Sequence, residues 1–174
     1  MADANASVTM GARVLMLTGA VGALLALCLP WVYEESAVTV GSSTAVGTNS
    51  DEWTGWTLHG ASRLDTHEPV SLLVYLIVIV GTAALLVGAW LAFERAERAW
   101  VPRSTAGVAA LLLVASFPLL SGVSGTFGAG HLTTTRYGII AWRVALAVVL
   151  AGAVRLSLWF EDRAHIRTRN LNPG

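Results

Sequence analysis

The chain has 174 residues, of which 55% are hydrophobic and only 13% charged, and its mean hydropathy is +0.63. This balance excludes an ordinary soluble domain, in which about a quarter of the residues are charged. The formal net charge is zero, so the chain lacks the basic surface that nucleic-acid binding needs. Its single cysteine, Cys28, excludes an intrachain disulfide, a cysteine-based zinc site and a CxxC redox pair.

Four apolar runs are long enough to cross a hydrocarbon core of about 30 Å as helices at 1.5 Å per residue. We predict spans at 14–33, 70–93, 105–127 and 137–160, separated by a long outer loop at 34–69 and two short connections. The first run is too long for a signal peptide, and no A-x-A-like cleavage site follows it. The sequence therefore predicts an all-α membrane protein: one domain over 1–174, built as a four-helix bundle.

Small residues recur in every predicted span, among them Gly19, Gly81, Gly88 and Gly152. Lipid tails are as apolar as leucine, so helices in a bilayer associate through close approach of their backbones rather than through hydrophobic exclusion. We expect these glycines to lie in contacts between helices.

The arginines predict the orientation of the bundle. All eleven basic residues are arginine, which is typical of a GC-rich prokaryotic genome. The 34–69 loop contains one of them, whereas six lie between the second and third spans or after the fourth: Arg95, Arg98, Arg103, Arg163, Arg167 and Arg169. Arginine-rich segments remain in the cytoplasm. We therefore expect a multi-pass plasma-membrane protein with both termini cytoplasmic.

Five of the seven tryptophans lie close to the predicted ends of the spans. Indole rings favour the headgroup level of a bilayer, so we interpret these five as two aromatic belts. Trp31 and Trp142 belong to the predicted outer belt, and the inner belt comprises Trp90, Trp100 and Trp159.

The outer loop is predicted to form a small extracellular β-sheet. Residues 36–40 and 43–48 are rich in β-branched residues and flank a glycine-containing turn, which indicates a hairpin, and residues 52–58 are a candidate third strand. A lone hairpin is marginally stable in water. We expect Trp53 and Trp56 to anchor it onto the bundle near Trp31 or Trp142, with a turn or bulge at Gly55; ligand stacking is the alternative.

The stretches "LPWVY" and "WTGW" carry a resemblance to a known family. Claudins end their first span with Pro-x-Trp and carry Trp-x-Gly-Leu-Trp, followed by two cysteines, in a first outer loop that forms a sheet. Here Pro30 and Trp31 lack the intervening residue, Trp53, Gly55 and Trp56 form a shorter version, and "TLHGAS" replaces the cysteines. The layout resembles a claudin-like tetraspan, which implies a four-helix bundle, an extracellular sheet and a role in contact or membrane organisation.

Two arginines, Arg143 and Arg155, fall within the fourth span. We expect Arg155 to extend to the inner headgroups, and Arg143 to reach the outer interface or an ion pair with carboxylates of the outer loop. The alternative is an anion-attracting path past Arg143, with a hinge at Pro118. Proton- or cation-coupled transport is disfavoured because no predicted span contains Asp or Glu.

Catalytic and metal-binding signatures are missing from the sequence. The outer-loop histidines His59, His67 and His131 match no spacing typical of metal ligands, and no nucleophile elbow or P-loop occurs. We therefore expect no enzyme activity, no metal and no cofactor. The predicted function is that of a structural or interaction protein in the bilayer whose partner is another membrane protein or its own copies. The alternative is a small transporter or channel component.

Overall fold

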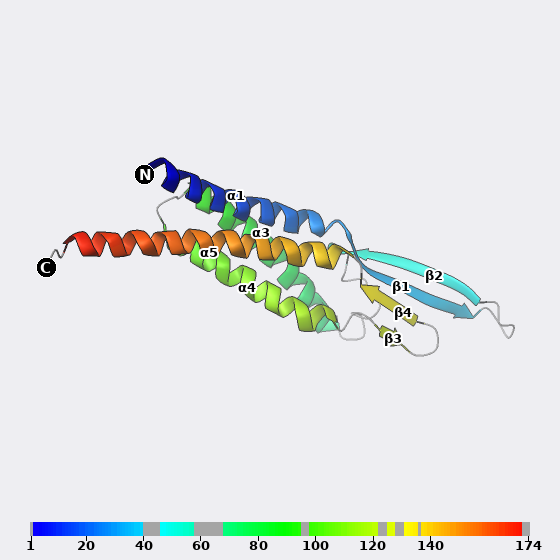
Figure 1. The fold of residues 1–174 in the computed structure, drawn as a ribbon. Coiled ribbons are helices and arrows are strands. Elements are labelled where there is room, and N and C mark those ends of the chain that lie inside the picture. The colour runs from blue at the N-terminus through cyan, green and yellow to red at the C-terminus, as the bar shows by residue number, and fades with distance from the viewer. Residues whose placement is uncertain are drawn as a thin grey trace.

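The computed structural model describes residues 2–39, 46–57, 68–94, 98–121, 125–127, 131–135 and 137–171. Its helices are α1 (Ala2–Ala26), α3 (Glu68–Glu94), α4 (Trp100–Ser121) and α5 (Tyr137–Leu171), and its strands are β1 (Pro30–Thr39), β2 (Val46–Thr54), β3 (Gly125–Phe127) and β4 (His131–Thr135). The helices form one elongated bundle, and the sheet extends from one end of it (Figure 1). Both termini lie at the opposite end.

Each helix contains a segment long and apolar enough to cross a membrane: Ser7–Ala26, Tyr75–Glu94, Trp100–Phe117 and Tyr137–Ala164. The four predicted spans are thereby confirmed in number and approximate position. The second is the closest match, since α3 begins and ends within two residues of the predicted bounds. The fourth begins at the predicted residue, but α5 continues as a helix to Leu171 and projects beyond the other helices (Figure 1).

The end predicted for the first span is wrong. The helix α1 ends at Ala26, and the following residues form tight turns, with Cys28 N donating to Leu25 O at 3.0 Å and Leu29 N to Ala26 O at 3.2 Å. Pro30 then begins β1. A proline has no backbone donor and disfavours helical geometry at the residue before it, and the tryptophan, valine and tyrosine that follow favour strands.

The end predicted for the third span is also wrong. The helix α4 continues three residues past Pro118 and ends at Ser121, and Gly125–Phe127 forms the strand β3. A glycine-rich stretch surrounds this boundary, and each glycine costs about 1 kcal/mol in a helix relative to alanine. The connection between α4 and α5 therefore contributes strands that the sequence did not predict.

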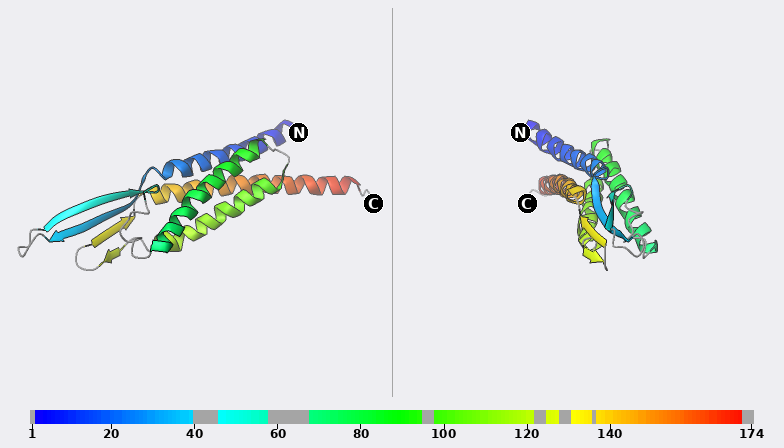
Figure 2. Two further views of the ribbon diagram at one scale, coloured as in Figure 1. Left: turned by 180° about the vertical axis from the view of Figure 1, so that it is seen from behind. Right: turned by 90° about the vertical axis from the view of Figure 1, so that its right-hand side faces the viewer.

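The sheet has four antiparallel strands in the order β2-β1-β4-β3. The hairpin between β1 and β2 confirms the predicted one, with Ser36 opposite Asn49 and Thr39 opposite Val46. It is longer than predicted, and residues 52–54 complete β2 rather than forming a third strand. Seen from behind, β1 and β2 project further from the bundle than β3 and β4 (Figure 2).

Glycines allow the helices to approach each other closely, as predicted. A Cβ on Gly19 of α1 would lie 2.7 Å from the backbone nitrogen of Val149 in α5. A Cβ on Gly152 of α5 would lie 2.8 Å from the carbonyl oxygen of Ala12 in α1. Because these neighbours are backbone atoms, they cannot yield by a change of rotamer. The α1–α5 contact therefore depends on glycine at both positions.

Candidate functional site

Several specific contacts join the sheet to the bundle, and Trp31 lies at their centre. The Trp31 side chain is completely buried. Its Nε1 donates a hydrogen bond of 2.8 Å to the carbonyl oxygen of Ala26, the last residue of α1. The last carbonyls of a helix have no partner within the helix, so the indole of Trp31, the second residue of β1, caps α1. This bond fixes the direction in which the chain leaves the bundle.

The Trp31 ring also packs on α5. Its centroid lies 5.4 Å from that of Trp142, and the two rings are tilted by 52°. Trp142 is buried too, and its Nε1 donates to Thr82 Oγ1 in α3 at 3.1 Å. Thr82 Oγ1 in turn donates to Val78 O at 2.7 Å. A continuous series of contacts therefore connects β1 to α5 and α3.

Two glycines flank the Trp31 ring. A Cβ on Gly55 would lie 3.0 Å from Trp31 Cε2 and 2.9 Å from Leu27 Cα. A Cβ on Gly138, at the start of α5, would meet Trp31 Cδ1 and would lie 2.6 Å from Pro30 O. Because glycine has no Cβ, each of the two positions leaves room for the Trp31 ring and for the backbone of the neighbouring residue. A special backbone role was predicted from the sequence for Gly55 but not for Gly138.

The strand β1 is irregular at this point. Pro30 pairs with Thr54 and Val32 with Trp53, so Trp31 is an additional residue in β1. Such a bulge re-aims a side chain and bends the strand. On β2, the predicted turn is confirmed, since Thr57 N donates to Thr54 O at 3.1 Å around Gly55. The bulge and the turn lie on opposite strands and together allow Trp31 to enter the core.

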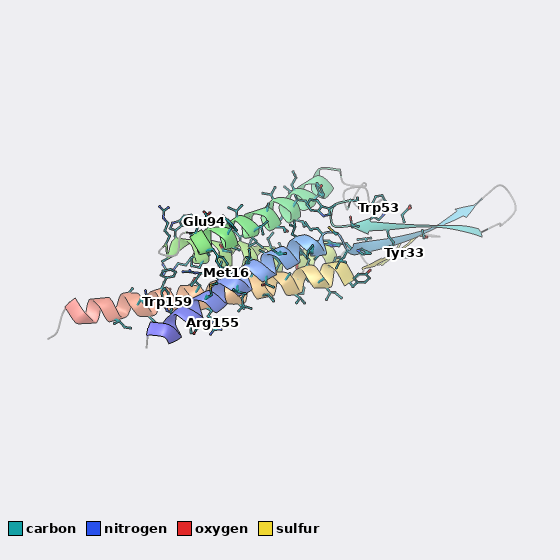
Figure 3. All side chains as sticks on the ribbon, turned by 90° about the horizontal axis from the view of Figure 1, so that it is seen from above. Met16, Tyr33, Trp53, Glu94, Arg155 and Trp159 are labelled. Atoms are coloured by element: carbon teal, nitrogen blue, oxygen red, sulfur yellow. The ribbon has the colours of Figure 1, made fainter. Side chains whose placement is uncertain are left out.

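The outer belt predicted from Trp31 and Trp142 is therefore wrong, because both rings are buried inside the protein. Their proximity to a span end gave the right depth along the bundle but not the direction of the side chain. In the predicted inner belt, Trp90 and Trp100 are exposed, and Trp159 is partly buried against Phe160 at 5.1 Å between centroids. Trp159 lies far from the sheet (Figure 3).

The paired tryptophans of the outer loop differ from each other. Trp53 is partly buried and packs against the hydrophobic core where the sheet meets the bundle (Figure 3). The Trp56 side chain is 39% exposed. Of the two predicted anchors, Trp53 has the expected position, whereas burial of Trp56 was wrongly predicted. Trp31 has the deepest position at the junction.

Among the strands that the structure describes, β2 lies at an edge of the sheet and pairs with β1. Ser50, Asp51 and Glu52 of β2 are polar and exposed, whereas Trp53 and Thr54, which lie closer to the bundle, are half-buried. Asp51 lies directly opposite Glu34 of β1. Like charges directly opposite each other destabilise a sheet, so the pairing of β1 with β2 does not explain why two carboxylates occupy these positions. This edge therefore presents an acidic surface at Asp51 and Glu52.

Among the residues whose side chains the structure describes, Arg143 contacts α4, and the expected ion pair with a carboxylate of the 34–69 loop stays a prediction. Its Nε donates to Ser116 Oγ at 3.1 Å and its Nη2 to Ser116 O at 2.8 Å. Its guanidinium carbon lies 4.4 Å from the centre of the Phe117 ring. These contacts connect α5 to the end of α4. Arg155 is exposed near the far end of the bundle (Figure 3), and its extension to the inner headgroups stays a prediction.

The arginine-rich end contains an ion pair between Arg103 of α4 and Glu161 of α5, with Nη2 and Oε1 3.0 Å apart. Arg163 lies over the Trp159 ring at 4.0 Å. Of the outer-loop histidines, His131 begins β4, and His59 and His67 lie outside the described residues. Within the described ranges, no group of three or more His, Cys, Asp or Glu side chains is arranged to hold a metal ion.

A scan against protein-family models gives no match for this chain, and a search of curated proteins also finds none.

Proposed function

We propose that this protein is a multi-pass plasma-membrane interaction protein that presents its sheet outside the cell and keeps both termini in the cytoplasm. The exposed acidic edge strand β2, held by a buried junction, is the observation that carries the proposal. Its role is to organise the membrane or cell envelope by binding another membrane protein or a second copy of itself. It acts without a cofactor and without catalysis.

The orientation rests on the two ends of the bundle. The end with both termini carries Arg103, Arg155 and Arg163 among its described residues, and the opposite end carries the sheet with Asp51 and Glu52. Arginines concentrate on the cytoplasmic side of membrane proteins. This distribution supports an extracellular sheet.

The β2 edge supports an interaction role because unpaired strand edges bind extended segments of other chains. Backbone hydrogen bonds then supply the affinity, and side chains on alternate positions supply the selectivity. Asp51 and Glu52 select for a partner segment that carries arginine or lysine. The junction at Trp31 limits movement of the sheet relative to the helices, so that binding costs less ordering entropy.

A claudin-like arrangement forms part of this proposal. It is supported by the four spans, by the sheet at the non-terminal end and by Pro30, Trp31, Trp53 and Gly55 meeting at the junction. The tryptophan contacts supply the restraint that the two loop cysteines supply in claudins. In contrast, the contacts of Arg143 with Ser116 and Phe117 favour a structural role for this arginine over an anion path.

The test is copurification from native membranes in mild detergent, with the mass of the complex measured by light scattering. The wild-type protein is expected to form an oligomer or to retain a stoichiometric partner. The Asp51→Lys, Glu52→Lys variant should lose this association. Glu94→Lys, Asp162→Lys makes the same charge change on exposed residues at the other end and should retain it. A wild-type monomer with nothing attached contradicts the proposal. A complex whose mass is unchanged by the Asp51→Lys, Glu52→Lys substitutions contradicts it as well.

A further inference from the structure

The exposure of Trp56 is unexplained by the packing of the sheet on the bundle. The ring is large and 39% exposed, although it follows directly after Gly55, which is buried in the junction. An indole exposed to water is unfavourable, because a tryptophan that could bury roughly 150–250 Å² then leaves part of its apolar area hydrated. The position of this ring along the bundle indicates what covers it.

The level of Trp56 is fixed by its neighbour. Gly55 packs against Leu27, the residue that follows the apolar segment Ser7–Ala26. Tyr137 begins the apolar segment Tyr137–Ala164 and is 59% exposed. The next residue, Gly138, packs against Pro30 and Trp31 at the same junction. Trp56 and Tyr137 therefore lie at one level, where two apolar segments end.

The exposed surface changes its chemistry at this level. On the bundle side, the exposed side chains are aliphatic, as at Leu25, Ile140 and Val144. On the sheet side, they are polar or acidic, as at Ser50 and Asp51. Between them lie the two exposed aromatic rings. Tryptophan and tyrosine are enriched at the headgroup level of membranes, where an apolar ring with a polar tip is favoured.

We propose that Trp56 and Tyr137 insert into the headgroup layer on the sheet side of the bilayer and form its aromatic belt. The partner of Trp56 is lipid, and the base of the sheet rests on the membrane surface. This inference does not depend on any protein partner. It assigns to Trp56 and Tyr137 the role that the sequence suggested for Trp31 and Trp142.

The opposite end gives an independent check on the spacing. Trp90 and Trp100 are exposed there, and Trp159 lies at the same end of α5. Along α5, Tyr137 and Trp159 are separated by about 33 Å at 1.5 Å per residue. This agrees with a hydrocarbon core of about 30 Å. The two aromatic levels thus lie at the two boundaries of one hydrocarbon core.

The test compares the tryptophan fluorescence of the full-length wild-type protein with that of Trp56→Phe in phosphatidylcholine vesicles. The difference spectrum isolates Trp56. A lipid with a nitroxide on its headgroup is expected to quench most of this difference, and aqueous iodide is expected to quench little of it. Strong quenching by iodide together with no loss from the headgroup nitroxide would overturn the proposal and leave Trp56 in water.

A second measurement leaves every tryptophan intact. The native Cys28, exposed and adjacent to Leu27, is spin-labelled in the same vesicles. Its nitroxide should be more accessible to oxygen than to a water-soluble nickel chelate. The control label, at Ser50→Cys in a Cys28→Ser background, should show the reverse. Equal access of the nickel chelate to both labels would place the junction outside the bilayer and refute the assignment.

Discussion

Replacing Trp31 by alanine should separate the sheet from the bundle. Truncating a buried tryptophan costs about 3–5 kcal/mol in transfer and cavity energy. The Ala26 carbonyl also loses the Nε1 hydrogen bond, which adds about 1 kcal/mol. We therefore expect Trp31→Ala to lower the free energy of unfolding by roughly 4–6 kcal/mol. The assay is pulse proteolysis in mixed micelles with increasing denaturing detergent, which reports the unfolded fraction.

Trp56→Ala is the matched control, because the same change is made to a ring that is 39% exposed and packs outside the core. In micelles it should cost less than about 1 kcal/mol, as for ordinary surface substitutions. Trp31→Phe should fall between the two, since it keeps an aromatic ring and loses the bond to Ala26. Equal destabilisation by Trp31→Ala and Trp56→Ala would refute the assignment of Trp31 as the main anchor.

Further predictions concern the contacts around this junction. Gly138→Val should destabilise the protein strongly, because its Cβ would meet Trp31 and Pro30. Gly107→Ala has open space around the new Cβ and should be neutral or stabilising by up to about 1 kcal/mol. Thermal unfolding in detergent measures the stability of both variants. Thr82→Val removes the acceptor for Trp142 Nε1 and should cost about 1–3 kcal/mol in the same assay, with Thr82→Ser nearly neutral. Arg143→Gln should lower stability by a similar amount without changing anion flux into proteoliposomes. Wild-type flux that disappears in this variant would instead support the transporter alternative.

The helices were predictable because the length of an apolar run is a local property of the sequence. This explains why α3 begins and ends within two residues of its predicted bounds. The same signal failed at residues 30–33, which are apolar because they fill the junction and not because they face lipid. Trp31 and Val32 are fully buried there, in a strand. Hydrophobicity alone does not distinguish these two environments.

The second half of the sheet was not predictable from local pattern. The strand β3 has only three residues and β4 five, and β4 pairs with β1, which lies far away in the sequence. The direction of the Trp31 and Trp142 rings likewise depends on neighbours from other elements. Two signals were present: Gly138 at a helix start, and Thr82, a polar residue in an apolar span that requires a partner. Arg143 was placed near the outer interface, but its partner Ser116 became evident only from the packing of α4 on α5.

We propose that the edge strand β2 is the interaction surface of this membrane protein. The most direct measurement is site-specific photo-crosslinking in native membranes, with a photoreactive amino acid at Ser50 on the exposed edge. Leu111 is the control position, because it is highly exposed on the apolar face of α4. We expect one defined protein adduct, or a dimer of the chain, at position 50 and lipid adducts at position 111. Protein adducts at position 111, with none at position 50, would contradict the proposal.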